Sequence, residues 1–236
     1  MERVDKVIAV SLNLSRADAK SYIKKGLVSV NGSIIKNIGL KIDEAADVIV
    51  CNGKRLEYNQ FVYIMMNKPK GVISASEGRN DKTVIDILPD DMKRKNLFPA
   101  GRLDKDTTGF MLITDDGDFA HKILSPKNHI PKTYIARLDK PFDDSVIAEF
   151  AKGIALGDDL CMPAKLSAAD GDYKTARVEI RQGMYHQIKR MFKKFGLTVI
   201  ELKRIKMGGL YLDESLKSGE CRYLTDKELE IIKYSK

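Results

Sequence analysis

The chain has 236 residues, of which 43% are hydrophobic, so it can bury one large core and a second, smaller one; a disordered or fibrous protein is excluded. No apolar run is long enough to cross a membrane and the first residues lack the apolar core of a signal peptide, so we expect a cytoplasmic protein. The formal net charge of +8 favours a polyanionic partner, and the 3 widely separated cysteines argue against disulfides and a zinc site.

The first helix that the sequence signals lies near residues 16–25. Ser15 followed by Asp18 is a typical N-terminal cap, and Gly26 ends the helical pattern. Three basic side chains recur at every fourth position and share one face: Arg16, Lys20 and Lys24. This face suits a phosphate backbone, and a solvated polar face of an ordinary small helical domain is the simpler alternative.

A β-hairpin is expected after this helix, over residues 27–35. Its turn is Asn31-Gly32, and Asn-Gly between alternating apolar residues is the strongest short-range hairpin signal. The composition becomes polar over residues 52–60, where we expect a linker. The sequence therefore predicts a small unit over residues 1–58 and a larger one over residues 59–236.

The larger unit mixes strands and helices without a regular βαβ period. A buried strand opens it at residues 61–66, and Thr225 with Glu228 forms a capping box before its last helix. Further strands are expected near residues 96–100, 110–114, 132–138, 173–180 and 197–206, and helices near residues 82–88, 116–124, 143–151, 185–195 and 225–233. No GxGxxG or Walker sequence appears, so the pattern favours an α+β fold with a largely antiparallel mixed sheet flanked by helices.

Asp104 stands among polar and flexible residues between the strands at 96–100 and 110–114. A carboxylate held on a loop between two fixed strands can act as a nucleophile or as a base. The simpler interpretation is a turn residue that caps its own backbone. The local sequence leaves both interpretations open.

Most of the excess positive charge lies in residues 181–206, where Glu201 is the single acidic residue. The basic residues of this segment are Arg181, Lys189, Arg190, Lys193, Lys194, Lys203, Arg204 and Lys206. A cluster of one sign suits the backbone of a nucleic acid, whereas a solvated helix face usually mixes both signs. We therefore expect this segment to bind nucleic acid.

Three segments in order resemble the pseudouridine synthases, and specifically the RsuA family. Gly101-Arg102-Leu103-Asp104 is similar to the family's catalytic motif, residues 132–137 with Tyr134 resemble its tyrosine motif, and residues 183–192 resemble its basic motif. The first 58 residues resemble the small αL fold of an S4 domain, whose helix and hairpin face structured RNA. The resemblance covers nearly the whole chain.

The resemblance implies an RNA isomerase that needs neither a cofactor nor a metal. Pseudouridine formation breaks the bond from N1 of uracil to C1′ of the ribose, turns the base, and rejoins it through C5. By this resemblance Asp104 is the catalytic nucleophile in a dry pocket, and Lys189 pairs with it to keep it charged. Tyr134 would pack against the target base and serve in proton transfer, although a core aromatic is the simpler interpretation of that residue.

Several other residues of the same motifs are expected to bind the substrate RNA. Arg102 could fill the gap left by a flipped uridine or bind a flanking phosphate. His186 and Gln187 belong to the basic motif, without an assigned chemical role. The expected helix places its apolar side chains toward the core, which leaves Arg190, Lys193 and Lys194 for phosphate contacts.

The basic motif resembles the branch of the family that modifies the small ribosomal subunit. This implies a uridine of 16S rRNA, equivalent to position 516, as the target. Gln182 departs from this pattern, because a glutamate is expected before the glycine. We expect a monomer that acts on structured rRNA or a small-subunit assembly intermediate, without a membrane.

Three alternatives stay open. The same type of enzyme could act on the large-subunit RNA, or an S4-containing protein could bind rRNA without chemistry. A glycoside hydrolase could use Asp104 and Asp106 as its carboxylate pair, but two residues so close on one loop rarely face each other across a substrate.

Overall fold

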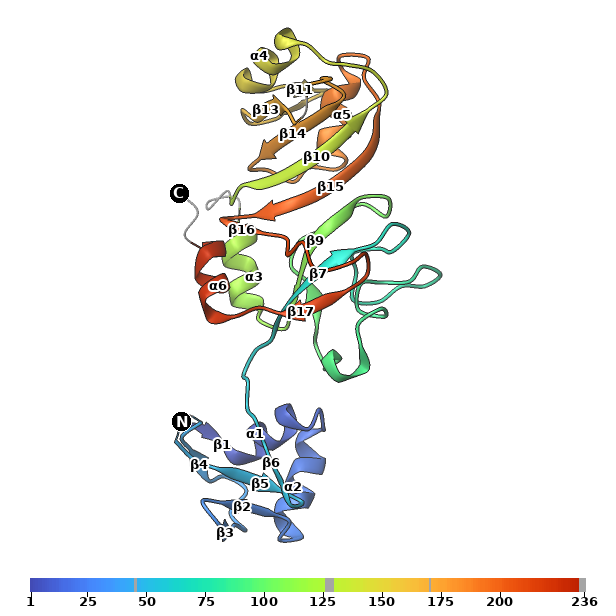
Figure 1. Cartoon of the computed structure of the whole chain (residues 1–236). Helices are drawn as coiled ribbons and strands as arrows, with labels where there is room; N and C mark the ends of the chain where they lie inside the picture. The colour runs from blue at the N-terminus through green and yellow to red at the C-terminus, as the bar shows by residue number, and fades with distance from the viewer. Residues whose placement is uncertain (45, 126–129, 170, 234–236) are drawn as a thin grey trace. The chain divides into compact units, whose positions relative to one another are not determined.

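The computed structural model describes residues 1–44, 46–125, 130–169 and 171–233, and it divides the chain into two compact units, Met1–Val62 and Tyr63–Lys236 (Figure 1). Composition placed this division a few residues earlier, after residue 58. Part of the predicted linker is wrong, because Asn52 and Gly53 form a hairpin turn with positive φ angles of 50° and 76°. This turn pairs Cys51 with Lys54.

The first unit packs two helices against short strands. Its elements are β1 (Glu2–Arg3), α1 (Val4–Ser11), α2 (Arg16–Lys24), β2 (Val28–Val30), β3 (Ser33–Ile34), β4 (Lys41–Ile42), β5 (Ile49–Cys51) and β6 (Lys54–Arg55). The strands β3, β2, β5 and β6 form one antiparallel sheet, and β1 pairs with β4. Side chains of α1 and α2, including Ile8 and Ile23, meet strand residues such as Val28 in a buried core.

The predicted basic helix and hairpin are both confirmed. Ser15 caps α2 by accepting a 3.1 Å hydrogen bond from the backbone N–H of Asp18. Asn31 and Gly32 both adopt positive φ angles, 51° and 80°, as a tight hairpin turn between β2 and β3 requires. The helix α1 was not predicted, because its N-cap residue, Arg3, makes no side-chain cap.

The second unit is built on one sheet of nine strands. Its elements are β7 (Tyr63–Lys68), the 3-10 helix η1 (Asp90–Met92), β8 (Phe98–Pro99), β9 (Thr108–Thr114), α3 (Gly117–Leu124), β10 (Lys132–Leu138), α4 (Asp144–Lys152), β11 (Ala155–Leu156), β12 (Asp159–Leu160), β13 (Lys165–Ala168), β14 (Thr175–Ile180), α5 (Gln187–Lys193), β15 (Val199–Met207), β16 (Leu210–Tyr211), β17 (Cys221–Tyr223) and α6 (Asp226–Lys233). The hairpin β11–β12 lies outside that sheet.

The main strand order is β13-β14-β10-β15-β9-β7-β17, with β16 on β15 and β8 on β9. Only β15 and β9 pair in parallel among these strands. At this junction Gly109 has a φ of 97°, and a Cβ there would lie 2.2 Å from the carbonyl oxygen of Arg204, so only glycine lets the two strands approach. The sheet is therefore mixed and largely antiparallel, as the sequence predicts.

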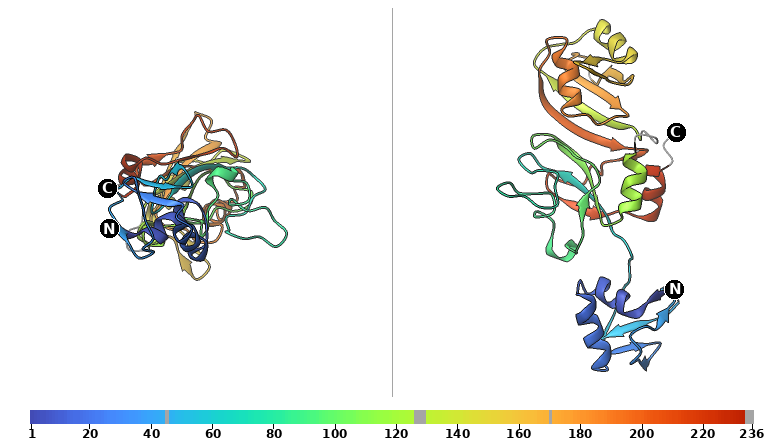
Figure 2. Two further views of the ribbon diagram at one scale, coloured as in Figure 1. Left: turned by 90° about the horizontal axis from the view of Figure 1, so that it is seen from below. Right: turned by 180° about the vertical axis from the view of Figure 1, so that it is seen from behind.

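Helices cover both ends of this sheet. The helices α3 and α6 lie side by side (Figure 2), and residues such as Phe119 and Ile232 pack with Phe110 of β9 in the main core. The helices α4 and α5 pack through their aromatic rings, since the centroids of Phe150 and Phe192 lie 4.9 Å apart. This packing fixes α5, which carries the basic motif.

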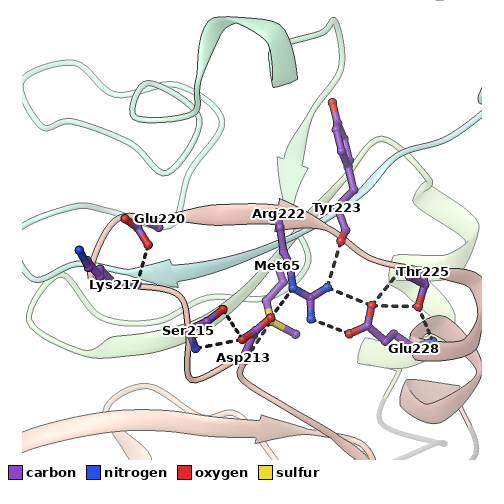
Figure 3. Close-up of polar contacts among 9 residues, drawn as sticks. All are labelled: Met65, Asp213, Ser215, Lys217, Glu220, Arg222, Tyr223, Thr225 and Glu228. Carbon is purple, nitrogen blue, oxygen red and sulfur yellow. Dashed lines mark hydrogen bonds and ion pairs between the residues drawn. The ribbon is translucent and has the colours of Figure 1, made fainter.

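A polar cluster fastens the last strand to the last helix (Figure 3). Arg222 of β17 donates to Asp213 through Nε at 2.6 Å and to both carboxylate oxygens of Glu228, at 2.7 and 3.0 Å. Glu228 also accepts a 2.9 Å bond from the backbone N–H of Thr225, which confirms the predicted capping box. The pKa of Asp213 and that of Glu228 are both lowered to about 2, chiefly by hydrogen bonds from Ser215 and Arg222 to Asp213 and from Arg222 to Glu228.

One predicted helix is wrong. Residues 82–88 form a turn, in which the side chain of Thr83 accepts from the N–H of Ile85 and that of Asp86. Asp86 in return accepts a 2.8 Å bond from the N–H of Thr83. These local bonds are those of a helix start, but Pro89 follows one turn later and the helix does not continue.

Within the part of the chain that the structure describes, no helix is both long and apolar enough to cross a membrane.

Candidate active site

The loop that carries Asp104 joins β8 to β9, and a buried lysine binds its backbone from the interior of the unit. Lys68, at the end of β7, is fully buried. Its Nζ donates to the carbonyl oxygens of Asp104 at 3.2 Å, Lys105 at 3.5 Å and Thr107 at 2.9 Å, and to that of Pro69 at 3.1 Å. Burial lowers the pKa of Lys68 to about 8, against the opposing charges of Asp106 and Asp104.

Two further contacts fix the same loop. The hydroxyl of Ser74 donates to the carbonyl of Leu103 at 2.8 Å and accepts from the N–H of Leu103 at 3.0 Å. Lys105 forms a 2.6 Å ion pair with Asp81. The loop is thus tied through its backbone on both sides of Asp104, which leaves the carboxylate of Asp104 pointing to other partners.

Those partners come from α5 and the residue before it. Nζ of Lys189 lies 3.0 Å from Oδ2 of Asp104 and 2.6 Å from Oδ1 of Asp106, so one ammonium binds both carboxylates. Burial alone would lower the pKa of Lys189, but the hydrogen bonds to Asp106 and Asp104 outweigh it and raise the pKa. The expected contact between Asp104 and Lys189 is therefore present.

The position of Lys189 follows from the packing of α5. Ile188, Met191 and Phe192 are buried, as the predicted apolar face requires, whereas Phe195 lies beyond the end of the helix and is half-buried. Lys189 lies beside this stripe with 23% of its side chain exposed. The helical spacing of the apolar residues thus places the ammonium of Lys189 at the border between core and solvent.

His186 is the second partner of Asp104. Its Nε2 lies 3.5 Å from Oδ1 of Asp104. As the N-cap of α5 it has a φ of 49°, a left-handed conformation that costs a residue with a Cβ about 1 kcal/mol or more and often occurs at functional sites. Its ring stacks on that of Tyr185 with the centroids 3.8 Å apart, and Tyr185 is 75% exposed.

A pocket of about 70 Å³ opens beside this cluster. Asp104, Tyr134, His186 and Lys189 are among its lining residues, together with Arg102. Tyr134 is buried in β10 and reaches the pocket from the sheet. In the free protein 28% of the Asp104 side chain is exposed to solvent, so the dry pocket that the chemistry requires stays a prediction for the complex with RNA.

The other predicted substrate-binding residues of this unit are divided between surface and interior. Arg190 donates to the carbonyl of Leu156 at 2.9 Å and Lys194 to that of Ala155 at 3.0 Å, so both hold the β11–β12 hairpin. Gln187 is buried and accepts from the N–H of Met184 at 3.1 Å, which is a structural contact. Lys193 is exposed.

The charge pattern of residues 181–206 suggested one basic surface patch, but the structure does not place all of these side chains on the surface. Arg204 is only 1% exposed and donates through Nε to the carbonyl of Phe110 at 2.7 Å. It lies on the interior side of β15 because the side chains of a strand alternate between faces. Its charge therefore belongs to the interior of the second unit and not to an outer face.

In the first unit the three basic residues of α2 differ from one another. Arg16 contacts the fully buried carboxylate of Asp5 at 2.8 Å, and Arg3 contacts it from the other side at 3.1 Å. Burial would raise the pKa of Asp5, but the hydrogen bonds from both arginines lower it. Arg16 is therefore engaged within the unit, whereas Lys20 is half-buried and Lys24 is exposed.

Sequence reasoning missed Lys68, and it counted Arg204 in the basic segment without foreseeing that it is buried. Lys68 stands at the end of a strand of buried residues, just before Pro69, and a lysine at a strand end is usually solvated. The sequence signal that could have marked it is the run of apolar residues 61–66 just before it, which predicts a buried strand. Among the described residues, no group of three His, Cys, Asp or Glu side chains is placed to hold a metal ion.

Chemically, the site presents a carboxylate on a rigid loop, a cation that pairs with it and a phenol on the pocket wall. This set can support nucleophilic attack and proton transfer. It does not suit glycoside hydrolysis by Asp104 and Asp106, because both carboxylates bind the same ammonium instead of flanking an open cleft.

Comparison with known proteins gives the family of this chain. The model of RNA pseudouridylate synthases matches residues 62–194, and the model of the S4 domain matches residues 2–49. A crystal structure of a pseudouridylate synthase is 38% identical and superposes with a TM-score of 0.69, covering 98% of this chain and 100% of that chain.

Two relatives match over almost their whole lengths. An RNA pseudouridine synthase of Bacillus subtilis (strain 168) is 40% identical over 233 residues, which are 98% of both chains. The ribosomal small subunit pseudouridine synthase A of Salmonella typhimurium is 41% identical over 229 residues, 96% of this chain and 98% of the relative. Since the family model covers more than half of the chain and these relatives span nearly all of it, the protein belongs to the RNA pseudouridine synthases and carries an N-terminal S4 domain.

Proposed function

We propose that this protein isomerises one uridine of the small-subunit ribosomal RNA, 16S rRNA, to pseudouridine, at the position equivalent to 516. The relative from Salmonella typhimurium, named for the small ribosomal subunit, supports this target through 41% identity over nearly the whole chain. The single observation that carries the chemistry is the 3.0 Å ion pair between Asp104 and Lys189 at the wall of a pocket that Tyr134 also lines.

In this proposal Asp104 is the nucleophile that attacks the flipped nucleotide, and the bond that its carboxylate forms breaks again by the end of the reaction, which regenerates the free carboxylate. The bond between N1 and C1′ breaks, the uracil turns, and a bond between C5 and C1′ forms, while C5 loses a proton and N1 gains one. Tyr134 is buried and lines the same pocket as the carboxylate, so its ring can stack on the base and its hydroxyl can relay a proton, gaining one as it passes its own on. Lys189 stabilises the negative charge of Asp104 through the ion pair.

RNA recognition in this proposal uses both units. Lys20 and Lys24 on α2 offer positive charge to the RNA backbone, and Lys193 does so beside the pocket. Arg102, which lines the pocket, fills the space that the flipped uridine leaves. Tyr185, stacked on His186 and largely exposed, offers a face for an unpaired base.

The protein would act as a monomer in the cytoplasm, where ribosomal subunits are assembled. The support for a monomer is that residues of one chain supply the carboxylate, the cation and the phenol of the pocket.

A matched pair of variants tests the nucleophile. Asp104→Asn keeps the shape of the side chain but cannot attack, so turnover on a small-subunit RNA fragment should fall by at least about 1000-fold with RNA affinity retained. Asp106→Asn removes the other carboxylate bound to Lys189 and should keep most of the activity. Equal losses in the two variants would refute the assignment of Asp104.

Pseudouridine mapping in ribosomal RNA from cells with and without the gene tests the target. One site in 16S rRNA should disappear with the gene and return with the wild-type copy but not with Asp104→Asn. A site lost from the large-subunit RNA instead would move the proposal to that RNA. An unchanged map would favour a protein that binds rRNA without modifying it.

A further inference from the structure

A second, larger cavity adjoins the pocket of Asp104. It measures about 460 Å³ and shares four lining residues with the smaller pocket: Arg102, Tyr134, Gly183 and Met184. Its remaining described lining residues include Lys132, Arg181 and Arg204, and none of the described lining residues is acidic. The cavity therefore brings four cationic side chains, those of Arg102, Lys132, Arg181 and Arg204, next to the proposed catalytic pocket.

The sheet explains why these charges meet. Lys132 and Tyr134 are two positions apart in β10, so their side chains share one face of the sheet. Arg204 of β15 lies directly opposite Tyr134 in the antiparallel register, and it projects to the same face. Arg181 follows β14, whose last residue, Ile180, pairs with Lys132. Strand register alone thus brings cations from three neighbouring strands to one cavity.

Arg204 is the most buried of these cations. Its side chain is 1% exposed, its Nε donates to the carbonyl of Phe110, and its Nη2 is buried with no hydrogen-bond partner among the described residues. A buried guanidinium without a counter-ion is destabilised, because the hydration of the ion is lost. Such a cost is usually offset by an anionic partner.

Lys132 leads to the same conclusion. It makes one hydrogen bond, of 3.2 Å, to the carbonyl of Ile130. Burial, with the nearby charge of Arg204, lowers the pKa of Lys132 to about 8. Lys132 and Arg204 repel each other at one wall of the cavity, and an anion bound between them would reduce this repulsion.

We propose that this cavity is a subsite for a backbone phosphate of the RNA strand next to the target uridine, with Lys132, Arg181 and Arg204 as its ligands. The inference rests on the proposed function, since RNA is the source of the anion. A phosphodiester is the anionic group of RNA, and a guanidinium matches two of its oxygens. A volume of about 460 Å³ holds a phosphate together with its ribose, and the shared wall at Tyr134 places that nucleotide beside the base held at Asp104.

Binding of small probes to the full-length protein tests this subsite without needing turnover. The probes are uridine, the dinucleotide uridylyl-(3′→5′)-uridine and inorganic phosphate, titrated at fixed ionic strength. The dinucleotide should bind about tenfold more tightly than uridine, since charge-assisted hydrogen bonds contribute that much or more. Lys132→Gln should remove most of this difference, and Arg181→Gln should reduce it.

Lys174→Gln is the matched control, because Lys174 is exposed and lies at the other end of β14 from Arg181. It removes one positive charge and should keep the full preference for the dinucleotide. Thermal melting checks that each variant folds, and Arg181→Gln decides the matter if Lys132→Gln does not fold.

Three results would overturn the proposal: equal affinity for uridine and the dinucleotide, an equal loss in Lys174→Gln, or inorganic phosphate that binds without competing with the dinucleotide. Pseudouridine formation is measured separately on the same preparations. Turnover without a preference for the dinucleotide contradicts the subsite alone, and a preference without turnover contradicts the proposed reaction alone.

Discussion

Lys68, the fully buried last residue of β7, donates a 2.9 Å hydrogen bond to the carbonyl oxygen of Thr107, the residue that precedes β9. The same ammonium also binds the carbonyl oxygen of Asp104. It thereby holds the backbone of the loop on which the proposed nucleophile depends, without touching the carboxylate.

Lys68→Met should show that this contact positions the loop. The change leaves several buried carbonyl oxygens without a donor, which should lower the free energy of unfolding by roughly 1–3 kcal/mol. We expect turnover at saturating RNA to fall at least about tenfold, because small displacements of reacting groups are costly, while RNA affinity changes little. Lys70→Met is the control, since Lys70 is exposed two residues away. A Lys68→Met variant with normal turnover would show that the loop keeps its geometry without the ammonium.

Lys189 and Lys193 lie four positions apart on α5 and should have different functions. Lys189 contacts two carboxylates, whereas Lys193 is exposed. Lys189→Ala should therefore reduce turnover at saturating RNA with a small change in affinity. Lys193→Ala should weaken RNA binding and lower its salt slope by about 0.7–0.9, as the loss of one phosphate contact requires. Single-turnover rates and binding at several salt concentrations measure both effects, and a pure binding defect in Lys189→Ala would contradict a catalytic ion pair.

The features that were predicted best from the sequence depend on residues that are close together in the chain. The cap at Ser15, the turn at Asn31-Gly32 and the capping box at Thr225 each rely on side chains a few positions apart, and the structure shows all three. Residues 82–88 show the limit of such signals, because the bonds of Thr83 and Asp86 start a helix that does not continue.

The contacts that order the site lie far apart in the chain and were only partly predictable. Lys189 and Asp104 could be paired from a family resemblance, but the second carboxylate at Asp106 was not expected there. Lys68 and Arg204 look like solvated basic residues in the sequence, since their burial depends on which strands become neighbours. Strand order is set by packing of the whole sheet and not by local propensity.

Arg16 and Lys24 share one face of α2 and should nevertheless act differently. Arg16 pairs with the buried carboxylate of Asp5, so Arg16→Ala should lower the stability of the first unit, by about 1–3 kcal/mol, as loss of a hydrogen-bonded charge pair does. Lys24→Ala removes an exposed charge and should leave the melting temperature unchanged while weakening RNA binding. Thermal melting and RNA titration of both variants decide this. If Lys24→Ala binds RNA normally, the basic face of α2 is a solvated surface.

The cluster around Arg222 predicts a defined pH dependence of stability. The folded-state pKa of Glu228 and that of Asp213 are both about 2, below the ordinary values of 4.5 and 3.8. A lowered pKa means that the folded protein holds fewer protons than the unfolded chain, so this contribution to stability is full above about pH 5 and is lost as the pH falls toward 2.

Arg222→Gln should remove the part of this contribution that comes from Glu228, because the bidentate contact depends on the guanidinium, whereas Asp213 keeps its hydrogen bonds from Ser215. At pH 7 the loss of the contact with Glu228 should make the variant less stable than the wild type by about 1–2 kcal/mol, a value reduced for partial solvent screening. The difference in melting temperature between the two proteins should then shrink steadily between pH 5 and pH 2. Lys152→Gln, which breaks the exposed ion pair with Glu149, should melt close to the wild type throughout. A constant difference between Arg222→Gln and wild type across this range would mean that Arg222 acts through packing and not through its two carboxylates.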